Sequence, residues 1–165
     1  MKMVKTLLMV PAFLLISGLW NLASANDHGG SSIKMIDNET VADADTMKWE
    51  RNRHTPWGMR IIVIDGDPSK AGPYTFRVKM PSGYKLPPHY HRDKRTVTVL
   101  KGTYWIGVGE VFDAKPMDMM EAGSFYTTEA DVPHFAWART EVILQESGYG
   151  PTDMRWVNPE DDPNY

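Results

Sequence analysis

From Met59 onward, the chain alternates short β-branched or aromatic runs with turn residues. The stretch MRIIVIDGDPSKAGPYTFRVKMPSGYKLPPH, residues 59–89, carries Asp-Gly, Asp-Pro, Gly-Pro and Pro-Ser-Gly between such runs. The same texture recurs in RTVTVLKG, TYWIGVG, SFYTTEADVPHFAWA and TEVILQESG. β-branched and aromatic residues favour strands, and the turn residues end them. The pattern predicts an all-β fold of about six or seven short strands, spaced as in a sandwich or barrel.

Two segments depart from this pattern. EVFDAKPMDMMEAG, residues 110–123, contains a proline and three methionines, and we expect a loop with one short helical turn. Residues 26–48 are polar and start rich in glycine and serine, which indicates a flexible lead-in that joins the fold only later. One barrel domain is therefore expected at 49–165, with Trp156 and Val157 of its tail docking on the barrel.

The N-terminus has the features of a secretory signal peptide. Two lysines precede an apolar stretch at residues 7–20, and a small-residue triplet ends at Ala25. The alternative is a single membrane anchor, but Pro11 and Gly18 interrupt the stretch, and a spanning helix needs about 20 apolar residues. The sequence predicts a signal peptide at 1–25 and a periplasmic or secreted mature protein.

Composition narrows the partners and the chemistry. The chain has 165 residues, and removing residues 1–25, with Lys2 and Lys5, leaves 140 residues with 16 basic and 21 acidic side chains. That is one ordinary domain with a net charge of −5 and no basic cluster, so neither nucleic acid nor, once the leader is removed, a membrane is an expected partner. There is no cysteine, which excludes disulfides and thiolate ligands or nucleophiles.

Three of the five histidines lie where they can form a metal site. His89 and His91 stand one residue apart at the start of a predicted strand, so their side chains share a face and can reach one ion. The alternative is a solvated pair at the strand entrance. His134, among apolar neighbours in a second strand, is the natural third ligand, although a lone histidine there is usually a hydrogen-bonded core residue. His28 and His54 are expected on the surface.

The spacing of these histidines resembles the two motifs of the cupin superfamily. The matching patterns are Gly83-x5-His89-x-His91-x3-Arg95-x6-Gly102 and Gly123-x10-His134. The phrases GDPSKAGPY, VTVLKG, PHFAWA and VNPEDDP also resemble small exported single-domain bacterial cupins. The resemblance implies a double-stranded β-helix, or jelly-roll, barrel with one divalent metal ion held by His89, His91 and His134. Because cupin barrels commonly pair through sheet edges, it also makes a homodimer an expectation.

Two places depart from the cupin pattern. Arg95 stands where the first motif usually has a glutamate, and arginine has no lone pair to give a metal. If Arg95 faces inward, it can pair with a substrate carboxylate; the alternative is that residues 92–95 form a solvated turn. Because Arg95 cannot bind the ion, Asp93, two residues beyond His91, could instead supply a carboxylate ligand. In the second motif, Glu129 and Asp131 replace the usual proline and glycine, which predicts an altered turn before the third histidine.

Further pocket groups are expected on the strands. Alternation requires that one of Tyr104 and Trp105 faces inward. Tyr126 is another candidate, as is Gln145, which shares a strand face with Ile143 and could line the mouth of the barrel. Together with the motif position of the arginine, this makes Arg95 and Gln145 the candidate catalytic residues.

Three imidazoles without a carboxylate leave positions open for water, dioxygen or a chelating substrate, which resembles the three-histidine cupin dioxygenases that use ferrous iron. We therefore expect a metal-dependent, dioxygenase-type enzyme for a small organic, carboxylate-bearing substrate, with Fe²⁺ as first choice and Zn²⁺, Mn²⁺, Ni²⁺ or Cu²⁺ as alternatives. Three other readings stay open: a Lewis-acid decarboxylase, isomerase or lyase, a non-catalytic sensor or carrier, and a metal-free barrel.

Overall fold

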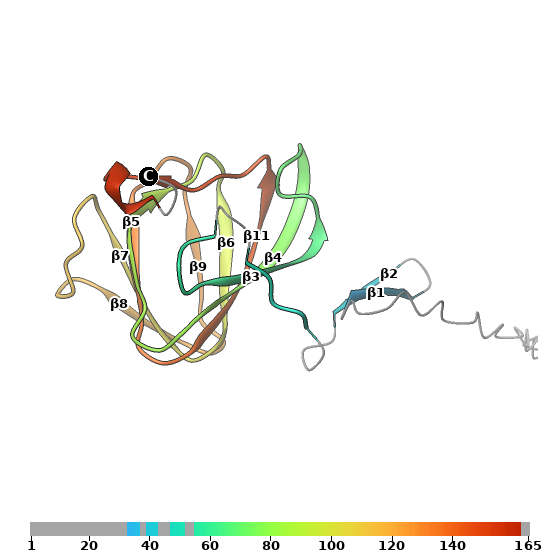
Figure 1. Ribbon diagram of the computed structural model, residues 1–165, viewed down its shortest axis with the longest axis horizontal. Helices are drawn as coiled ribbons and strands as arrows, with labels where there is room; N and C mark the ends of the chain where they lie inside the picture. Colours follow the sequence, from blue (N-terminus) through green and yellow to red (C-terminus); the bar gives the residue numbers. More distant parts are fainter. Residues whose placement is uncertain (1–32, 37–38, 43–46, 52–54, 163–165) are drawn as a thin grey trace, which may run out of the picture.

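The fold consists of two antiparallel five-stranded sheets that face one another (Figure 1). The computed structural model describes residues 33–36, 39–42, 47–51 and 55–162. One sheet has the strand order β12-β5-β10-β7-β8, and the other has the order β3-β4-β11-β6-β9. This confirms the all-β, double-sheet architecture that the alternating pattern predicts.

The strand bounds are as follows. The first sheet contains β5 (Lys85–Tyr90), β7 (Thr103–Val108), β8 (Asp118–Glu121), β10 (His134–Ala138) and β12 (Arg155–Trp156). The second sheet contains β3 (Arg60–Gly66), β4 (Gly72–Met80), β6 (Arg95–Lys101), β9 (Phe125–Thr128) and β11 (Val142–Gly150). A separate hairpin pairs β1 (Ile33–Ile36) with β2 (Glu39–Ala42).

The segment 110–123 differs from its expected loop with a helical turn, because it contains strand β8. This strand pairs with β7, and its middle residues alternate as an edge strand should: Met120 packs against the core while Met119 is exposed. The one helical turn among the described residues is a 3₁₀ turn, η1 (Pro159–Asp161), in the C-terminal tail. There the Asn158 side chain caps the turn by accepting from the backbone N–H of Glu160.

Several expectations for the N-terminal part fall outside the described residues. These are the signal peptide at 1–25 and the surface positions of His28 and His54. Within 26–48, the expected lead-in, the structure describes the hairpin β1-β2, which the sequence pattern did not predict. Across the part of the chain with described coordinates, no helix is long and apolar enough to cross a bilayer.

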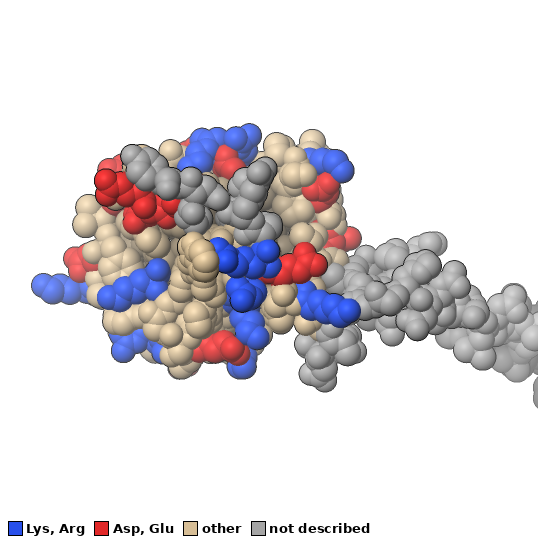
Figure 2. Space-filling model, viewed as in Figure 1, with Lys and Arg blue, Asp and Glu red and all other residues tan. Residues whose placement is uncertain are grey.

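The core lies between the two sheets, on the faces where alternate residues point inward. The buried residues of β4, β6 and β11 that form most of it are Tyr74, Phe76, Val78, Met80, Val97, Val99, Val142 and Leu144. Burying each such apolar side chain contributes roughly 1.5–3 kcal/mol. On the face in Figure 2, basic and acidic side chains are interspersed rather than gathered by sign.

The turn between β6 and β7 explains one motif glycine. Gly102 has φ +87°, a left-handed conformation, and a Cβ there would lie 2.2 Å from the carbonyl oxygen of Glu141. Only glycine fits both conditions. The turn that Gly102 permits sends the chain from one sheet into the other, and so positions β7 beside β10, the strand that begins with a candidate ligand.

Candidate metal centre and its cavity

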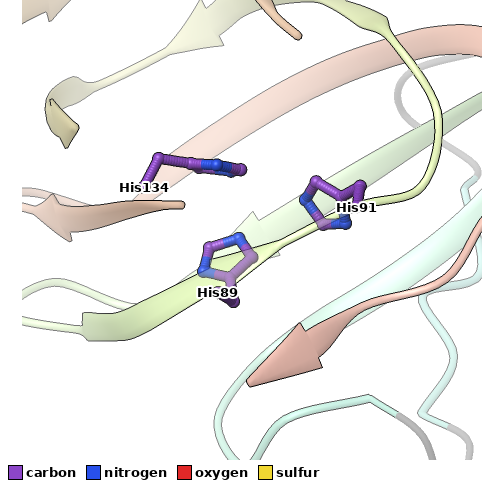
Figure 3. A group of neighbouring side chains, drawn as sticks. All are labelled: His89, His91 and His134. Atoms are coloured by element: carbon purple, nitrogen blue, oxygen red, sulfur yellow. The ribbon is translucent and has the colours of Figure 1, made fainter. Parts of the chain in front are cut away.

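Strands β5 and β10 bring the three candidate histidines together. His134 begins β10 and lies directly opposite His89 in the antiparallel register, and His91 follows His89 by two residues. Residues opposite one another in such a pair have Cβ atoms about 4.5–5.5 Å apart. The ring centroid of His89 lies 4.3 Å from that of His134 and 5.0 Å from that of His91, and the centroids of His91 and His134 are 5.1 Å apart. Figure 3 shows the three rings grouped together and tilted relative to one another.

Backbone carbonyls fix the tautomer of all three imidazoles. Nδ1 of His89 lies 2.8 Å from the carbonyl oxygen of Pro87, and Nδ1 of His134 lies 2.9 Å from that of Val132. Nδ1 of His91 lies 2.6 Å from the carbonyl oxygen of Asp153. A carbonyl oxygen only accepts, so each Nδ1 carries the proton and each Nε2 keeps a free lone pair. Such partners typically orient histidine ligands in metal sites.

Burial keeps these imidazoles neutral. The three side chains are 2%, 4% and 6% exposed, which penalises their charged forms. Burial, with a smaller contribution from the neighbouring His134, lowers the pKa of His89 to about 3. Burial and the charge of Arg95 likewise lower the pKa of His91, and burial lowers that of His134. Neutral imidazoles are the form that binds a metal.

The donor set fits a divalent ion. One potential ligand atom from each histidine lies within 4.8 Å of the others, and within the described ranges no carboxylate joins this group. Three imidazoles suit Fe²⁺, Ni²⁺, Cu²⁺ and Zn²⁺, and three protein ligands leave positions for water or substrate. The donor set does not select among these ions.

Arg95 faces inward, which is one of the two orientations considered from the sequence. Its positive charge is already paired with two carboxylates. It is 4% exposed and begins β6, beside the histidines. Its Nη1 donates to Oε2 of Glu146 at 3.0 Å, and its Nη2 donates to Oδ1 of Asp93 at 2.9 Å. Burial alone would lower the pKa of Arg95, but the negative charges of Glu146 and Asp93 raise it above its usual value.

Asp93 is part of this ion-pair network and is not in the histidine group. Its carboxylate accepts from Arg95 and from the hydroxyls of Tyr74 and Thr152. Gly148 leaves room for these contacts, because a Cβ there would lie 2.5 Å from the Tyr74 hydroxyl and 2.9 Å from Oδ2 of Asp93. The additional metal ligand considered from the sequence is thus engaged elsewhere.

Gln145 does not line the cavity, contrary to the sequence-based expectation. Its side-chain oxygen accepts from Nε of Arg77 at 3.0 Å on the other face of the sheet. Alternation along β11 instead turns Leu144 and Glu146 inward. The sequence did not reveal this because three apolar residues in a row, at 142–144, leave the parity of the strand undecided. Glu146 is the cavity residue that sequence reasoning missed.

The cavity between the sheets has a volume of about 450 Å³. Tyr104 and Tyr126 both line it, with ring centroids 6.2 Å apart, whereas Trp105 points to the outer face. Burial raises the pKa of both tyrosines, so they are neutral phenols. The wall around the polar groups is apolar and consists chiefly of Met59, Ile61, Phe76, Val78, Met80, Leu86, Val97, Leu144 and Trp156. This size and lining are typical of a small-molecule site.

The C-terminal strap, defined here as residues 151–157, closes one side of the site. Besides accepting from His91, it places Thr152 against Arg95, and the side chain of Asp153 accepts from Nε of Arg92 at 2.7 Å. Strand β12 within it pairs with β5, and the ring of Trp156 lies 5.9 Å from that of His89. The expected docking of the tail is therefore observed, and it reaches the metal ligands.

The turn before His134 keeps the conformation that a glycine would give. Asp131, at the position of the usual glycine, has φ +57°, and its N–H donates to the carbonyl oxygen of His91 at 2.7 Å. Aspartate tolerates this left-handed conformation better than most residues. The bond ties the third ligand's turn to the second ligand.

Comparison with known proteins identifies the fold. No protein-family model and no curated protein sequence matches the chain. Among solved structures, an RmlC-like cupin from Shewanella frigidimarina NCIMB 400 matches with a TM-score of 0.54 and 16% identity, covering 72% of this chain and 94% of that one. KdgF from Halomonas sp. matches with a TM-score of 0.52 and 14% identity over 66% and 91%. The cupin domain of Schizosaccharomyces pombe Cnp3 matches at 0.54 and 10% over 67% and 74%.

The chain has the cupin fold. At these identities the likeness concerns the fold alone, and cupin barrels support unrelated activities, so function must be argued from the site. The fold that the motif spacing implied is confirmed, and the three motif histidines form one buried group. Kinship with small exported bacterial cupins stays a prediction.

Proposed function

We propose that this cupin is an exported, metal-dependent enzyme of the dioxygenase type that acts on a small organic molecule inside its barrel. The observation that supports it best is the set of three buried imidazoles, each with Nδ1 bound to a backbone carbonyl and Nε2 free, at the wall of an apolar cavity of about 450 Å³. Such preorganisation restricts the rings to one orientation before any ion arrives.

One divalent ion, Fe²⁺ as first choice, is part of the proposal. When bound, Fe²⁺ would supply the capacity to activate dioxygen, and Zn²⁺, Mn²⁺, Ni²⁺ or Cu²⁺ are the alternatives. His89, His91 and His134 would hold the ion. The apolar wall would exclude water from the bound substrate, and Tyr104 and Tyr126 would offer neutral hydroxyls to it. Arg95 would not contribute a free positive charge, because it is paired with two carboxylates.

A non-catalytic sensor or carrier is the second candidate. It is favoured by the same ion-pair network, since a buried arginine replaces the glutamate of the cupin motif. Lewis-acid chemistry, as in a decarboxylase, isomerase or lyase, remains the alternative reaction class. Export rests on the predicted signal peptide at 1–25. The proposed homodimer rests on the edge strands β3, β8, β9 and β12, which two copies can cover by pairing.

Elemental analysis tests the metal site directly. We would compare the wild type, purified without chelators and then loaded with Fe²⁺, with a His89→Ala/His134→Ala double variant and with Gln145→Ala, a control outside the cavity. The proposal expects one ion per chain in the wild type and in the control, and none in the double variant. Equal metal content in all three proteins, or no metal in any after reconstitution, would reject the site.

Turnover separates the enzyme from the carrier. With the Fe²⁺-loaded protein, oxygen uptake in a panel of small enols, phenols and thiols should yield product in excess of the protein concentration and should vanish in His134→Ala. A ligand that binds tightly and is recovered unchanged would support the carrier instead. Uptake that persists in His134→Ala would reject the three-histidine mechanism.

A further inference from the structure

The charges that face the cavity are arranged unusually for a site built around a positive ion. The cavity wall carries Arg95 and Glu146, which form an ion pair at 3.0 Å with 4% and 14% of their side chains exposed. Asp93, whose side chain is 6% exposed, forms a second ion pair with the same guanidinium, with 2.9 Å between Oδ1 of Asp93 and Nη2 of Arg95. The positive charge of Arg95 is therefore balanced by two negative charges.

With a divalent ion bound, the positive charges at the three histidines and Arg95 exceed the negative charges of the two carboxylates that pair with Arg95. A divalent ion and Arg95 contribute three positive charges, and Asp93 and Glu146 contribute two negative ones. These four groups together then carry one positive charge, which a single negative charge on the ligand neutralises. At the outer mouth Arg92 and Arg155 pair with Asp153, and Arg155 also lies 3.6 Å from Asp131, so two cations and two anions cancel there.

We propose that Glu146 is a specificity-determining residue that restricts the cavity to ligands with one negative charge and turns dianions away. The inference rests on the proposed function, since it takes the ion at the three histidines as given. The ligand class is a small, largely apolar chelator, such as an enolate or phenolate, rather than a chelator that carries an additional carboxylate. This reverses the sequence-based expectation that Arg95 receives a substrate carboxylate.

The hydrogen-bonding groups of Glu146 and Arg95 also favour a ligand with a neutral oxygen over one with a carboxylate. Only one oxygen of Glu146 accepts from Arg95, so the other is free to accept from a hydroxyl of the ligand. Within the described residues, Nε of Arg95 is a buried donor without a partner, and a neutral oxygen satisfies it without a further charge. A carboxylate at the same place would lie beside Glu146 and be repelled, because like charges in a dry cavity are weakly screened.

Kojic acid and comenic acid form a matched pair of probes. Both chelate through the same hydroxypyranone ring and lose one proton in doing so, but comenic acid has a carboxylate where kojic acid has a hydroxymethyl group. Binding to the Co²⁺-loaded protein would be measured by calorimetry and by the visible absorption of the ion. Each affinity would be divided by that of free Co²⁺, which removes the intrinsic difference between the two chelators.

The wild type should disfavour comenic acid by about tenfold, since Arg95, Asp93 and Glu146 together carry one net negative charge, and one like charge about 10 Å away at an effective dielectric constant of about 20 costs about that much. Glu146→Gln keeps an acceptor for Arg95 but leaves it one carboxylate short, so the preference should shrink by about tenfold. Glu141→Gln is the control: this glutamate is exposed and pairs with Lys101, and the change in net charge is the same. The control should retain the wild-type preference.

The outcomes separate this inference from the proposed function. If the wild type binds both probes with the ratio of the free ion, or if Glu146→Gln and Glu141→Gln behave alike, the inference fails while the metal site stands. If Glu146→Gln does not fold, the ratio of the two probe affinities in the wild type still tests the inference. A wild type that takes up no divalent ion overturns both. A metal-loaded protein that discriminates as expected but never consumes oxygen overturns only the enzyme.

Discussion

Removal of Arg95 provides the sharpest test of the ion-pair network. In Arg95→Met, the side chain keeps an unbranched apolar stem but loses the guanidinium. Asp93 and Glu146, bound at 2.9 and 3.0 Å and almost entirely buried, would then lack their cationic partner. The hydroxyl of Thr152 would lose its donor as well.

The expected loss is large because the side chains of Asp93 and Glu146 are only 6% and 14% exposed, so water replaces the lost partner poorly. Breaking a buried ion pair by removing one partner costs roughly 3–5 kcal/mol, against roughly 5–15 kcal/mol for the whole free energy of unfolding. Replacing all three charges should restore most of it, since a neutral substitute for a buried ion pair is often no less stable. The triple variant Arg95→Met/Asp93→Asn/Glu146→Gln should therefore lie within about 1–2 kcal/mol of the wild type.

Urea unfolding of the metal-free proteins measures these free energies. The midpoint should fall in Arg95→Met at an unchanged slope, and it should recover in the triple variant. Lys101→Met is the matched control, because its partner Glu141 lies at a similar 2.8 Å but both side chains are exposed, at 59% and 43%. An exposed pair contributes about 0–1 kcal/mol, and added salt weakens it further.

The reasoning would be refuted if Arg95→Met cost no more than Lys101→Met. It would also fail if the single and triple variants were equally destabilised, because the cost would then come from lost packing and not from uncompensated charge.

Three further predictions concern the ligands and their surroundings. Asp131 has φ +57°, so Asp131→Ala should be less stable than Asp131→Gly by about 1 kcal/mol in thermal or urea unfolding; equal stabilities would argue against a left-handed turn. A methyl group at Gly148 would collide with Tyr74 and Asp93, so Gly148→Ala should cost roughly 1–3 kcal/mol, and a neutral effect would contradict the close approach. Burial lowers the pKa of His89 to about 3, below its unfolded value of about 6.5. The free energy of unfolding of the metal-free protein should therefore be at its full value above about pH 6.5 and decline as the pH falls toward 3. Urea midpoints that stay constant from pH 7 to 4 would contradict this.

The histidine group could be predicted because its geometry depends on short-range rules. Two ligands one residue apart on a strand share a face whatever the rest of the chain does. The third ligand was predicted from the spacing between Gly123 and His134 in the second motif. The register of β5 with β10 places His134 opposite His89. The orientation of Arg95 was one of two open alternatives because a charged residue at a strand entrance can face either way.

What surrounds the histidines could not be predicted, because it depends on parity and long-range contacts. Gln145 was expected inside and Glu146 was overlooked, since the apolar run 142–144 fits either face of β11. Trp156 was expected to dock, but its position beside His89 follows from the pairing of β12 with β5. Trp156 and His89 are 67 residues apart in the sequence, and no local pattern encodes such a pairing. The contact between Thr152 and Arg95 is of the same kind.

One of the three histidines therefore depends on a part of the chain that carries no cupin motif. His89 is oriented by its own strand, His134 by the turn before β10, and His91 by the C-terminal strap. The strap also holds Arg95 through Thr152, and Arg95 in turn pairs with Glu146 at the cavity wall. Ligand orientation and cavity charge thus share one set of contacts. A change in the strap should alter metal binding and ligand selection together, whereas a change at Glu146 should alter ligand selection alone.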